Sequence, residues 1–452
     1  MMRYLPHTEE EIREMLAVIG KASVDDLFTS IPEEARFQGS LQVPPALSEP
    51  ALMAHLSELA GENRAAKMLS FLGAGMYAHH IPPAVDQLLL RSEFYTAYTP
   101  YQPEVAQGTL QAIWEFQTIV SELYGLPLAN ASLYDGASAT AEAAQMARRL
   151  TKRDRVLVCK SVHPDYRNTT ETYLSGTGRS HYAEVAVGKT GAADADAIAG
   201  ALDDRTACIV VGYPSFYGAV PDLRAIAKVA HDRGALLVTA CSEPYALSVL
   251  ESPGACGADI AVGEGQALAC PPNFGGPGVG LFACRDDRNY LQQLPGRLCG
   301  ATVDSNGKRG FVLTLSTREQ HIRRERATSN ICTNQGLLAL SLTIRTSMLG
   351  KSGFVDVGKQ CLSKAVYLEQ QITSLPGYSR TFAKAPFFNE FAVEVRGGSA
   401  AAVVKKLEDA GIIAGLDVSR VDPERKGTLL VSVTEKHTKA DLDRLVAALA
   451  GL

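Results

Sequence analysis

The chain has 452 residues, of which 46% are hydrophobic and 21% are charged. These proportions are typical of globular proteins and exclude the disordered and fibrous classes. With 44 basic and 49 acidic residues, the net charge is -5, so the chain lacks the basic excess of a nucleic-acid-binding protein. No window approaches the roughly 18 uninterrupted apolar residues of a membrane span. We expect neither nucleic acid nor a membrane as a partner.

The nine cysteines are odd in number and scattered, and none forms a CxxC pair or a Cys/His cluster with zinc spacing. This usage predicts no disulfide framework and no metal site. The N-terminal residues contain no apolar targeting segment. A reducing compartment, the cytoplasm, is therefore the expected location.

Residues 1–80 are predicted to form an arm of short helices separated by Pro and Gly. Thr8 and Glu11 have the spacing of a capping box at the start of a helix, and residues 49–60 form a second helical run. Two interpretations stay open: an arm that wraps a partner subunit, and a segment that docks on its own chain.

Residues 81–350 are predicted to form one large α/β domain. Helical patterns alternate with short apolar runs at 156–159, 181–187, 207–211, 236–240, 260–262 and 279–283. Continuous apolar strands indicate a largely parallel sheet that is buried on both faces. A long helix from Thr333 to Gly350 should follow, and then another over 357–375. Residues 351–452 should form a small α+β domain with strands at 391–395 and 428–433 and helices at 400–410 and 439–449.

Two segments contain small residues that could approach a phosphate. The run Phe274–Gly280 is interrupted by Pro277 and leads into a strand, which is the wrong order for a dinucleotide-binding turn. The segment Tyr134–Glu142 leads directly into a helix, whose N–H groups could bind a phosphate. On spacing alone, a plain helix entry capped by Ser138 or Thr140 is the better explanation of that segment.

Two polar segments are candidates for binding. Tyr95–Glu104 carries three tyrosines among prolines; tyrosine suits interfaces and ligand pockets, although a packed loop is also possible. Arg323–Asn330 carries three arginines, which could bind a carboxylate or phosphate or could belong to a solvated helix face.

Together these segments resemble the glycine decarboxylase, or P-protein, of the glycine cleavage system. The resemblance covers the chain from about residue 4 to its end. It is carried by Asn130–Ser132 with the small-residue loop after it, the Gly275–Gly278 turn, and the blocks YTAYTPYQPE (95–104) and RERATSNICT (324–333). The resemblance implies an aspartate-aminotransferase-like fold of the pyridoxal-phosphate enzymes (fold type I). It also implies decarboxylation of glycine and transfer of the aminomethyl group to the lipoyl arm of the H-protein. The length corresponds to the N-terminal half, or subunit 1, of that family.

Pyridoxal phosphate requires a lysine amine, a carboxylate for the pyridine nitrogen and a phosphate site. In the family, the lysine lies a fixed distance before the glycine-rich turn. Counting back from that turn, the resemblance implies that Gln266 occupies the lysine position in this chain, and no lysine lies between Lys228 and Lys308. Thr239 and Ala240 stand at the end of the strand where the carboxylate should lie. His163 falls where the family's ring-stacking residue is expected, although a lone histidine is also commonly structural. We therefore expect a vestigial pocket made by Gly136, Ala137, Ser138, His163 and Gln266.

The resemblance thus implies a subunit that does not carry the cofactor. A lysine-bearing subunit 2 would hold pyridoxal phosphate in an α2β2 assembly, and this chain would complete that site with Tyr95, Tyr98, Tyr101, Gln102, Glu104, Arg326, Ser329 and Asn330. Two alternatives remain: a stand-alone pyridoxal-phosphate enzyme that uses Lys308 or Lys160, and a purely structural interaction subunit.

Overall fold

The computed structural model describes residues 6–96, 98–176, 181–273, 275–315 and 319–452. Ala97 of the tyrosine segment and Phe274 of the glycine-rich run lie outside the described residues. The chain divides into two compact units, Met1–Arg64 and Ala65–Leu452, and each is described here by itself. The predicted domain limits at residues 80 and 350 stay predictions.

The first unit consists of short helices. Its predicted capping box is present: the Thr8 hydroxyl accepts from the Glu11 N–H at 3.2 Å, and the Glu11 carboxylate accepts from the Thr8 N–H at 2.7 Å. Both bonds satisfy amides that the first helical turn leaves free. The helices are α1 (Glu9–Val18), two 3-10 turns (Asp25–Phe28 and Glu33–Ala35) and α2 (Glu49–Gly61), and a further turn (Arg64–Lys67) leads into the second unit.

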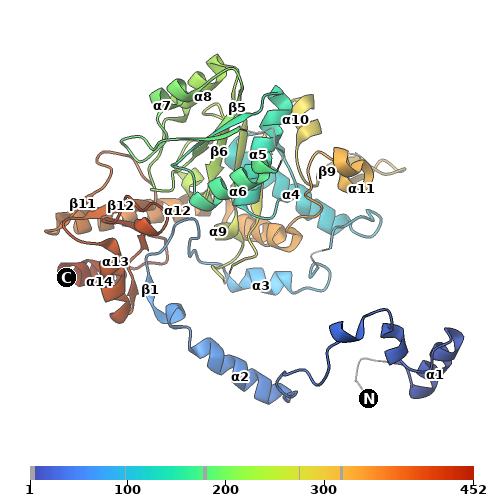
Figure 1. Ribbon diagram of the computed structural model, residues 1–452. Helices are drawn as coiled ribbons and strands as arrows, with labels where there is room; N and C mark the ends of the chain where they lie inside the picture. Colours follow the sequence, from blue (N-terminus) through green and yellow to red (C-terminus); the bar gives the residue numbers. More distant parts are fainter. Residues whose placement is uncertain (1–5, 97, 177–180, 274, 316–318) are drawn as a thin grey trace. The chain divides into compact units, whose positions relative to one another are not determined.

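A seven-stranded sheet forms the core of the second unit (Figure 1). Neighbouring pairs among β7, β6, β5, β3 and β4 are parallel, whereas β8 runs antiparallel to both β7 and β2. The prediction of a largely parallel sheet is confirmed. In spatial order the strands are β2 (Leu128–Ala129), β8 (Gly280–Cys284), β7 (Ile260–Glu264), β6 (Leu236–Cys241), β5 (Thr206–Gly212), β3 (Arg155–Cys159) and β4 (His181–Val185).

Helices cover both faces of this sheet. Side chains of α5 (Gly136–Thr151) pack on the face formed by Val156, Val210, Val238 and the alternate residues of the neighbouring strands. The other face is covered by α7 (Ala195–Ala201) and α8 (Leu223–Asp232) at one end and by α4 (Gln107–Tyr124), α9 (Gln266–Ala269) and α12 (Gly336–Ser374) at the other. Burial on both faces is why the strands read as continuous apolar runs. On the α5 side the layer also contains α6 (Pro164–Ser175) and α10 (Arg288–Gln293). The short helix α3 (Pro83–Leu89) contacts α12.

The longest helix, α12 (Gly336–Ser374), contains a break at Gly350. Gly350 has φ 61° and ψ 178°, a conformation that only glycine adopts readily. The sequence predicted two separate helices, with the first ending at Gly350. The structure confirms two helices that meet at Gly350, and the second begins directly after this residue instead of at residue 357.

The last hundred residues form a second, antiparallel sheet with the order β11-β12-β15-β14. The predicted strands and helices are present as β12 (Glu390–Val395), β15 (Thr428–Ser432), α13 (Ala400–Asp409) and α14 (Lys439–Ala450). The sequence did not predict several short elements: β1 (Leu69–Ser70), β13 (Ile412–Ile413), β14 (Leu416–Asp417), β11 (Tyr378–Arg380), the hairpin β9 (Cys299–Val303) and β10 (Arg309–Leu313), α11 (Gln320–Arg323), and 3-10 turns at Pro244–Ser248, Arg324–Arg326 and Val418–Arg420. No helix among the described residues is long and apolar enough to cross a membrane.

Candidate functional site

The tyrosine segment lies on the surface between α3 and α4. Tyr95, Tyr98 and Tyr101 are 62%, 76% and 48% exposed, and Gln102 and Glu104 are also exposed. The rings of Tyr98 and Tyr101 meet edge to face, with their centroids 5.8 Å apart. These side chains are therefore presented outward and are not packed in the core, which is unusual for three neighbouring tyrosines.

Arg297 joins this segment to the second predicted one. Its buried guanidinium donates to the Tyr101 hydroxyl and to the Cys332 carbonyl, both at 2.7 Å. It also forms an ion pair with Glu319 and lies 5.0 Å from the centre of the Tyr101 ring. A bond between the Thr99 and Thr333 hydroxyls, at 3.3 Å, makes a second connection. Arg297 and the threonine pair thus connect the tyrosine segment to Glu319, Cys332 and Thr333, which flank the second predicted segment.

Sequence reasoning missed Arg297. Its only local signal is the turn Pro295-Gly296-Arg297, and a single arginine after a turn is common on protein surfaces. Its role depends on three residues that are distant in sequence, Tyr101, Glu319 and Cys332, so the spacing of residues could not reveal it.

The arginine-rich segment borders an open cavity of about 520 Å³. Arg326 is exposed, with Glu325 at 3.8 Å, while the Ser329 hydroxyl accepts from the Ile331 N–H at 3.0 Å. Ser329 and Asn330 line the cavity, and Glu142 of α5 lies at its wall. Burial raises the pKa of Glu142, and its Oε2 has no hydrogen-bond partner among the described residues.

A carboxylate accepts hydrogen bonds from the N–H groups at the start of α5, where the sequence offered a possible phosphate site. Glu264, at the end of β7, accepts from the backbone N–H groups of Gly136 at 3.0 Å, Gln266 at 3.0 Å and Val279 at 2.8 Å. Asp135 caps the same helix by accepting from the Ser138 N–H at 2.7 Å. Burial raises the pKa of Glu264 to about 7, although the three N–H bonds act in the opposite direction.

Gln266 lies beside this carboxylate at the first position of α9. Its side chain is buried, and its Nε2 donates to the Cys270 carbonyl at 2.5 Å. An amide cannot form an imine with a carbonyl compound, because its nitrogen lone pair is delocalised. The donor at this position therefore does not fit the covalent attachment that pyridoxal phosphate requires.

His163 begins α6 as its N-cap. Its Nδ1 accepts from the Asp165 N–H at 3.1 Å, and its Nε2 donates to the Ala74 carbonyl at 2.9 Å. Burial lowers the pKa of His163, in agreement with the neutral tautomer that these two bonds require. Tyr166 connects the ring to the α5 start: the two ring centroids are 5.0 Å apart, and the Tyr166 hydroxyl abuts Gly136.

The structure therefore brings the predicted pocket residues into one cluster, but their groups do not fit the cofactor. The cluster consists of Gly136, Ala137, Ser138, His163 and Gln266, with Glu264 and Tyr166, which the sequence did not single out. Thr239 and Ala240 are buried at the end of β6, and neither carries a carboxylate for a pyridine nitrogen. Glu243, the nearest acid in sequence, accepts instead from the Tyr245 N–H at 3.0 Å.

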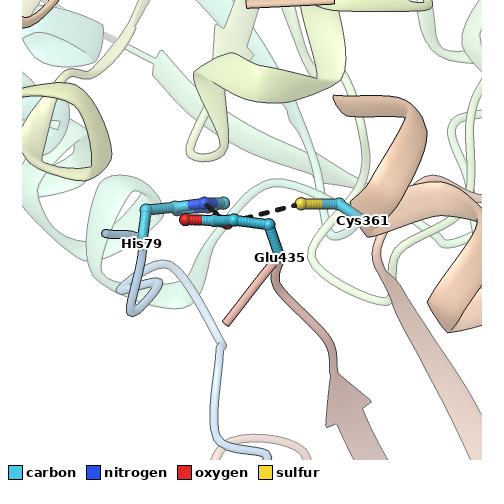
Figure 2. Close-up of side chains that lie close together, drawn as sticks. All are labelled: His79, Cys361 and Glu435. Atoms are coloured by element: carbon cyan, nitrogen blue, oxygen red, sulfur yellow. Dashed lines mark hydrogen bonds and ion pairs between the residues drawn. The ribbon is translucent and has the colours of Figure 1, made fainter. Parts of the chain in front are cut away.

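A second cluster contains residues that could ligate a metal. His79, Cys361 and Glu435 lie together in Figure 2, although they are far apart in sequence. The His79 Nδ1 is 2.6 Å from a Glu435 oxygen, and its Nε2 is 2.9 Å from Glu243. A separation of 2.6 Å is that of a charge-assisted hydrogen bond and leaves no room for an ion between the two atoms. The histidine thus bridges two carboxylates.

The electrostatics of this cluster agree with that description. Burial alone would lower the pKa of His79, but Glu243, Cys361 and Glu435 raise it, and the net pKa lies well above 6.5. The pKa of Glu435 is lowered to about 2, because its bond to His79 overcomes the effect of burial. The cluster is therefore an imidazolium between two carboxylates. His79 comes from the loop of residues 71–82, Glu243 follows the end of β6, and Glu435 lies in the loop after β15.

Comparison with known proteins decides the family. The family described as "Glycine cleavage system P-protein" matches residues 2–449. The chain belongs to the P-protein family. A relative from Sorangium cellulosum (strain So ce56), called "Probable glycine dehydrogenase (decarboxylating) subunit 1", is 63% identical over 452 residues, which are 100% of this chain and 99% of the relative.

Solved structures agree with the P-protein assignment. A crystal structure of "glycine decarboxylase (P-protein) of the glycine cleavage system, in inhibitor-bound form" matches with a TM-score of 0.89 and 42% identity, and each chain is covered completely. A sphingosine-1-phosphate lyase of Burkholderia pseudomallei has a TM-score of 0.67 at 16% identity, with 93% of this chain and 94% of that chain covered, and shares the fold alone. The family resemblance and the predicted fold type I of the pyridoxal-phosphate enzymes are confirmed.

Proposed function

We propose that this chain is the cofactor-free subunit of a heteromeric glycine decarboxylase. The assembled enzyme would decarboxylate glycine, release CO2 and transfer the aminomethyl group to the lipoyl group of an H-protein. The observation that supports the proposal is the pair Glu264 and Gln266. A carboxylate binds the N–H groups at the α5 start that a phosphate would need, and the buried Gln266 carries an amide where the resemblance implies a lysine. The name "subunit 1" of the Sorangium cellulosum relative supports a second subunit.

In this proposal the partner, a subunit 2, supplies the lysine and holds pyridoxal phosphate. The setting is cytoplasmic, as the scattered cysteines predict. Glycine reaches the partner's site, and neither nucleic acid nor a membrane takes part. We retain α2β2 as the expected assembly.

This chain contributes a surface to the partner's site. Tyr95, Tyr98, Tyr101, Gln102 and Glu104 are exposed and polar, and Arg297 fixes Tyr101 from below. Exposed aromatic side chains that are held in place lose little entropy on binding. Arg326, Ser329 and Asn330 extend the same surface, because Arg297 also holds the Cys332 carbonyl. We infer that this surface shapes the access of glycine and of the lipoyl arm.

The stand-alone alternative would need Lys160 or Lys308. Lys160 is exposed and lies 3.7 Å from Glu184. Lys308 is exposed in the turn between β9 and β10, where its N–H donates to Asp304. Both amines are therefore exposed to solvent and lack the enclosed surroundings of a lysine that forms a stable imine.

The proposal is tested by borohydride reduction in the presence of pyridoxal phosphate, followed by peptide mapping. The purified chain should yield no pyridoxyl-lysine, and the complex with subunit 2 should yield one on subunit 2 only. Full decarboxylation of glycine by subunit 2 alone would support a purely structural role and contradict our proposal. A pyridoxyl-lysine at position 160 or 308 would establish the stand-alone enzyme.

A further inference from the structure

The Glu264 carboxylate gathers three N–H donors from three separate segments. They come from the first residue of α5, the first residue of α9 and the residue before β8, at 3.0, 3.0 and 2.8 Å. Convergent backbone N–H groups at the start of a helix are the usual binding site of a phosphate group. Here they are aimed at a carboxylate of the same chain.

We propose that Glu264 is a built-in anion that takes the place of a cofactor phosphate at the start of α5 and closes this site to phosphate-bearing ligands. The inference rests on the proposed function, because it explains how a cofactor-free subunit keeps the fold of a cofactor-binding one. It also explains why the site stays ordered: the N–H groups that a lost phosphate would leave unsatisfied have an internal partner.

The space around the carboxylate is also filled. The Tyr166 ring lies against Gly136, where even a Cβ atom would collide with it. A Cβ atom at Gly278 would lie 2.9 Å from Glu264 Oε2. A phosphate, which is larger than a carboxylate, therefore finds no room while Glu264 is in place.

A second contact closes the neighbouring part of the cluster. The Ala74 carbonyl accepts from His163 Nε2, and a Cβ atom at Gly75 would lie 2.6 Å from that nitrogen. The Ala74 N–H in turn donates to Glu390 at 2.7 Å. The backbone at Ala74 and Gly75 thus covers the Nε2 side of the His163 ring. Access to the cluster is therefore blocked at a second place besides Glu264.

The experiment opens the site by replacing the carboxylate. Glu264→Ser leaves three N–H donors without their anion, and inorganic phosphate should then bind at least about tenfold more tightly than to the unaltered chain, as expected for bonds to a charged group. Binding is measured by phosphorus NMR at about pH 8, where the Glu264 carboxyl is ionised. Asp417→Ser is the matched control, because Asp417 is also a buried carboxylate that accepts from a backbone N–H, that of Ser419, but not at α5.

Two further ligands separate the possible sources of the phosphate group. Pyridoxal 5′-phosphate should compete with inorganic phosphate for Glu264→Ser, and pyridoxal, which lacks the phosphate, should not. If the folded Glu264→Ser variant binds phosphate no better than the Asp417→Ser control, the inference is wrong.

A measurement on the unaltered chain covers the case in which Glu264→Ser does not fold. The Gly136 amide resonance should stay unchanged when phosphate or pyridoxal 5′-phosphate is added, and a saturable shift would overturn the inference. That result is independent of the borohydride test. If the Gly136 resonance does not shift but a pyridoxyl-lysine is found in this chain, only the proposed function is rejected. If the resonance shifts and no pyridoxyl-lysine is found, only the role of Glu264 is rejected.

Discussion

The guanidinium of Arg297 and the hydroxyl of Tyr101 are 2.7 Å apart, although 196 positions separate them in the chain. Arg297 is almost fully buried, whereas the Tyr101 ring is about half exposed. A buried cation therefore fixes the orientation of an aromatic side chain at the surface. This relationship joins the tyrosine segment to the 319–333 segment, and the first two predictions depend on it.

Tyr101→Phe should lower glycine turnover by the reconstituted enzyme between about tenfold and a hundredfold, the range expected when positioning is lost. The stability of the chain should change by only about 1 kcal/mol, because Arg297 keeps Glu319 and the Cys332 carbonyl as partners. Turnover is compared with the free energy of unfolding in urea. Tyr367→Phe, which removes a hydroxyl bound to Asp443 at 2.6 Å in the C-terminal sheet region, should leave turnover unchanged. Unchanged turnover in Tyr98→Phe and Tyr101→Phe together would exclude the proposed role of the segment.

Cys332 should be protected from alkylation when subunit 2 is added. All nine cysteines are among the described residues, and Cys332 alone is exposed. Since its carbonyl is bound by Arg297, it lies on the surface that we assign to the partner's site. Labelling with iodoacetamide, followed by peptide mass spectrometry, should slow several-fold in the complex, with half-buried Cys270 as the internal reference. Equal labelling rates with and without subunit 2 would place the interface elsewhere.

His79→Gln should lower the free energy of unfolding by about 3–5 kcal/mol, the cost of leaving buried carboxylates without their cation. Urea unfolding measures this loss. His231→Gln serves as the control, because His231 is partly exposed and its partner Asp259 keeps a bond to Arg285; its cost should be about 1 kcal/mol or less.

The same cluster should give the stability a defined pH dependence. The pKa of His79 is raised, so its contribution is fully present below pH 6.5 and is lost as the pH rises through the folded-state pKa, well above that value. The pKa of Glu435 is lowered from 4.5 to about 2, so its contribution is present above 4.5 and is lost as the pH falls toward 2. His79→Gln should weaken both dependences in urea titrations. If the variant retains the wild-type losses at both ends, His79 is not the bridging cation.

Gly350→Ala should destabilise the chain by about 1–3 kcal/mol, because a Cβ atom strains the backbone at φ 61° and ψ 178°. Space is not the cause, since nothing lies within 4 Å of the added atom. Gly336→Ala, also with nothing within 4 Å but at the regular start of α12, should be neutral or stabilising by up to about 1 kcal/mol. Equal effects of the two substitutions in urea unfolding would show that Gly350 tolerates a helical geometry.

Local patterns predicted most of the regular structure. Strands buried on both faces are continuous in sequence, so β3, β5, β6 and β7 were found within a residue or two. Thr8 and Glu11 predicted their helix start because a capping box is a contact between residues three apart. The hairpin β9–β10 was missed because its strands are exposed at one end and do not alternate clearly.

The sequence predicted many of the residues of the candidate site, but not how they contact one another. The tyrosine and arginine segments, Gln266 and the small residues before α5 could be named from the sequence, and the family resemblance could be stated from them. Arg297 and Glu264 could not, because a lone arginine and a lone glutamate have no local signature. Their partners are supplied by segments that only the folded chain brings near.

The sequence by itself determined that this chain has the fold of a cofactor-dependent enzyme and lacks a lysine near the glycine-rich turn, because fold and reactive group both depend on residue type and local order. Only the tertiary structure shows which group binds the N–H donors at the start of α5. Three N–H groups from three segments converge on one point, and these donors need an acceptor there. Only the folded chain shows that Glu264 provides it.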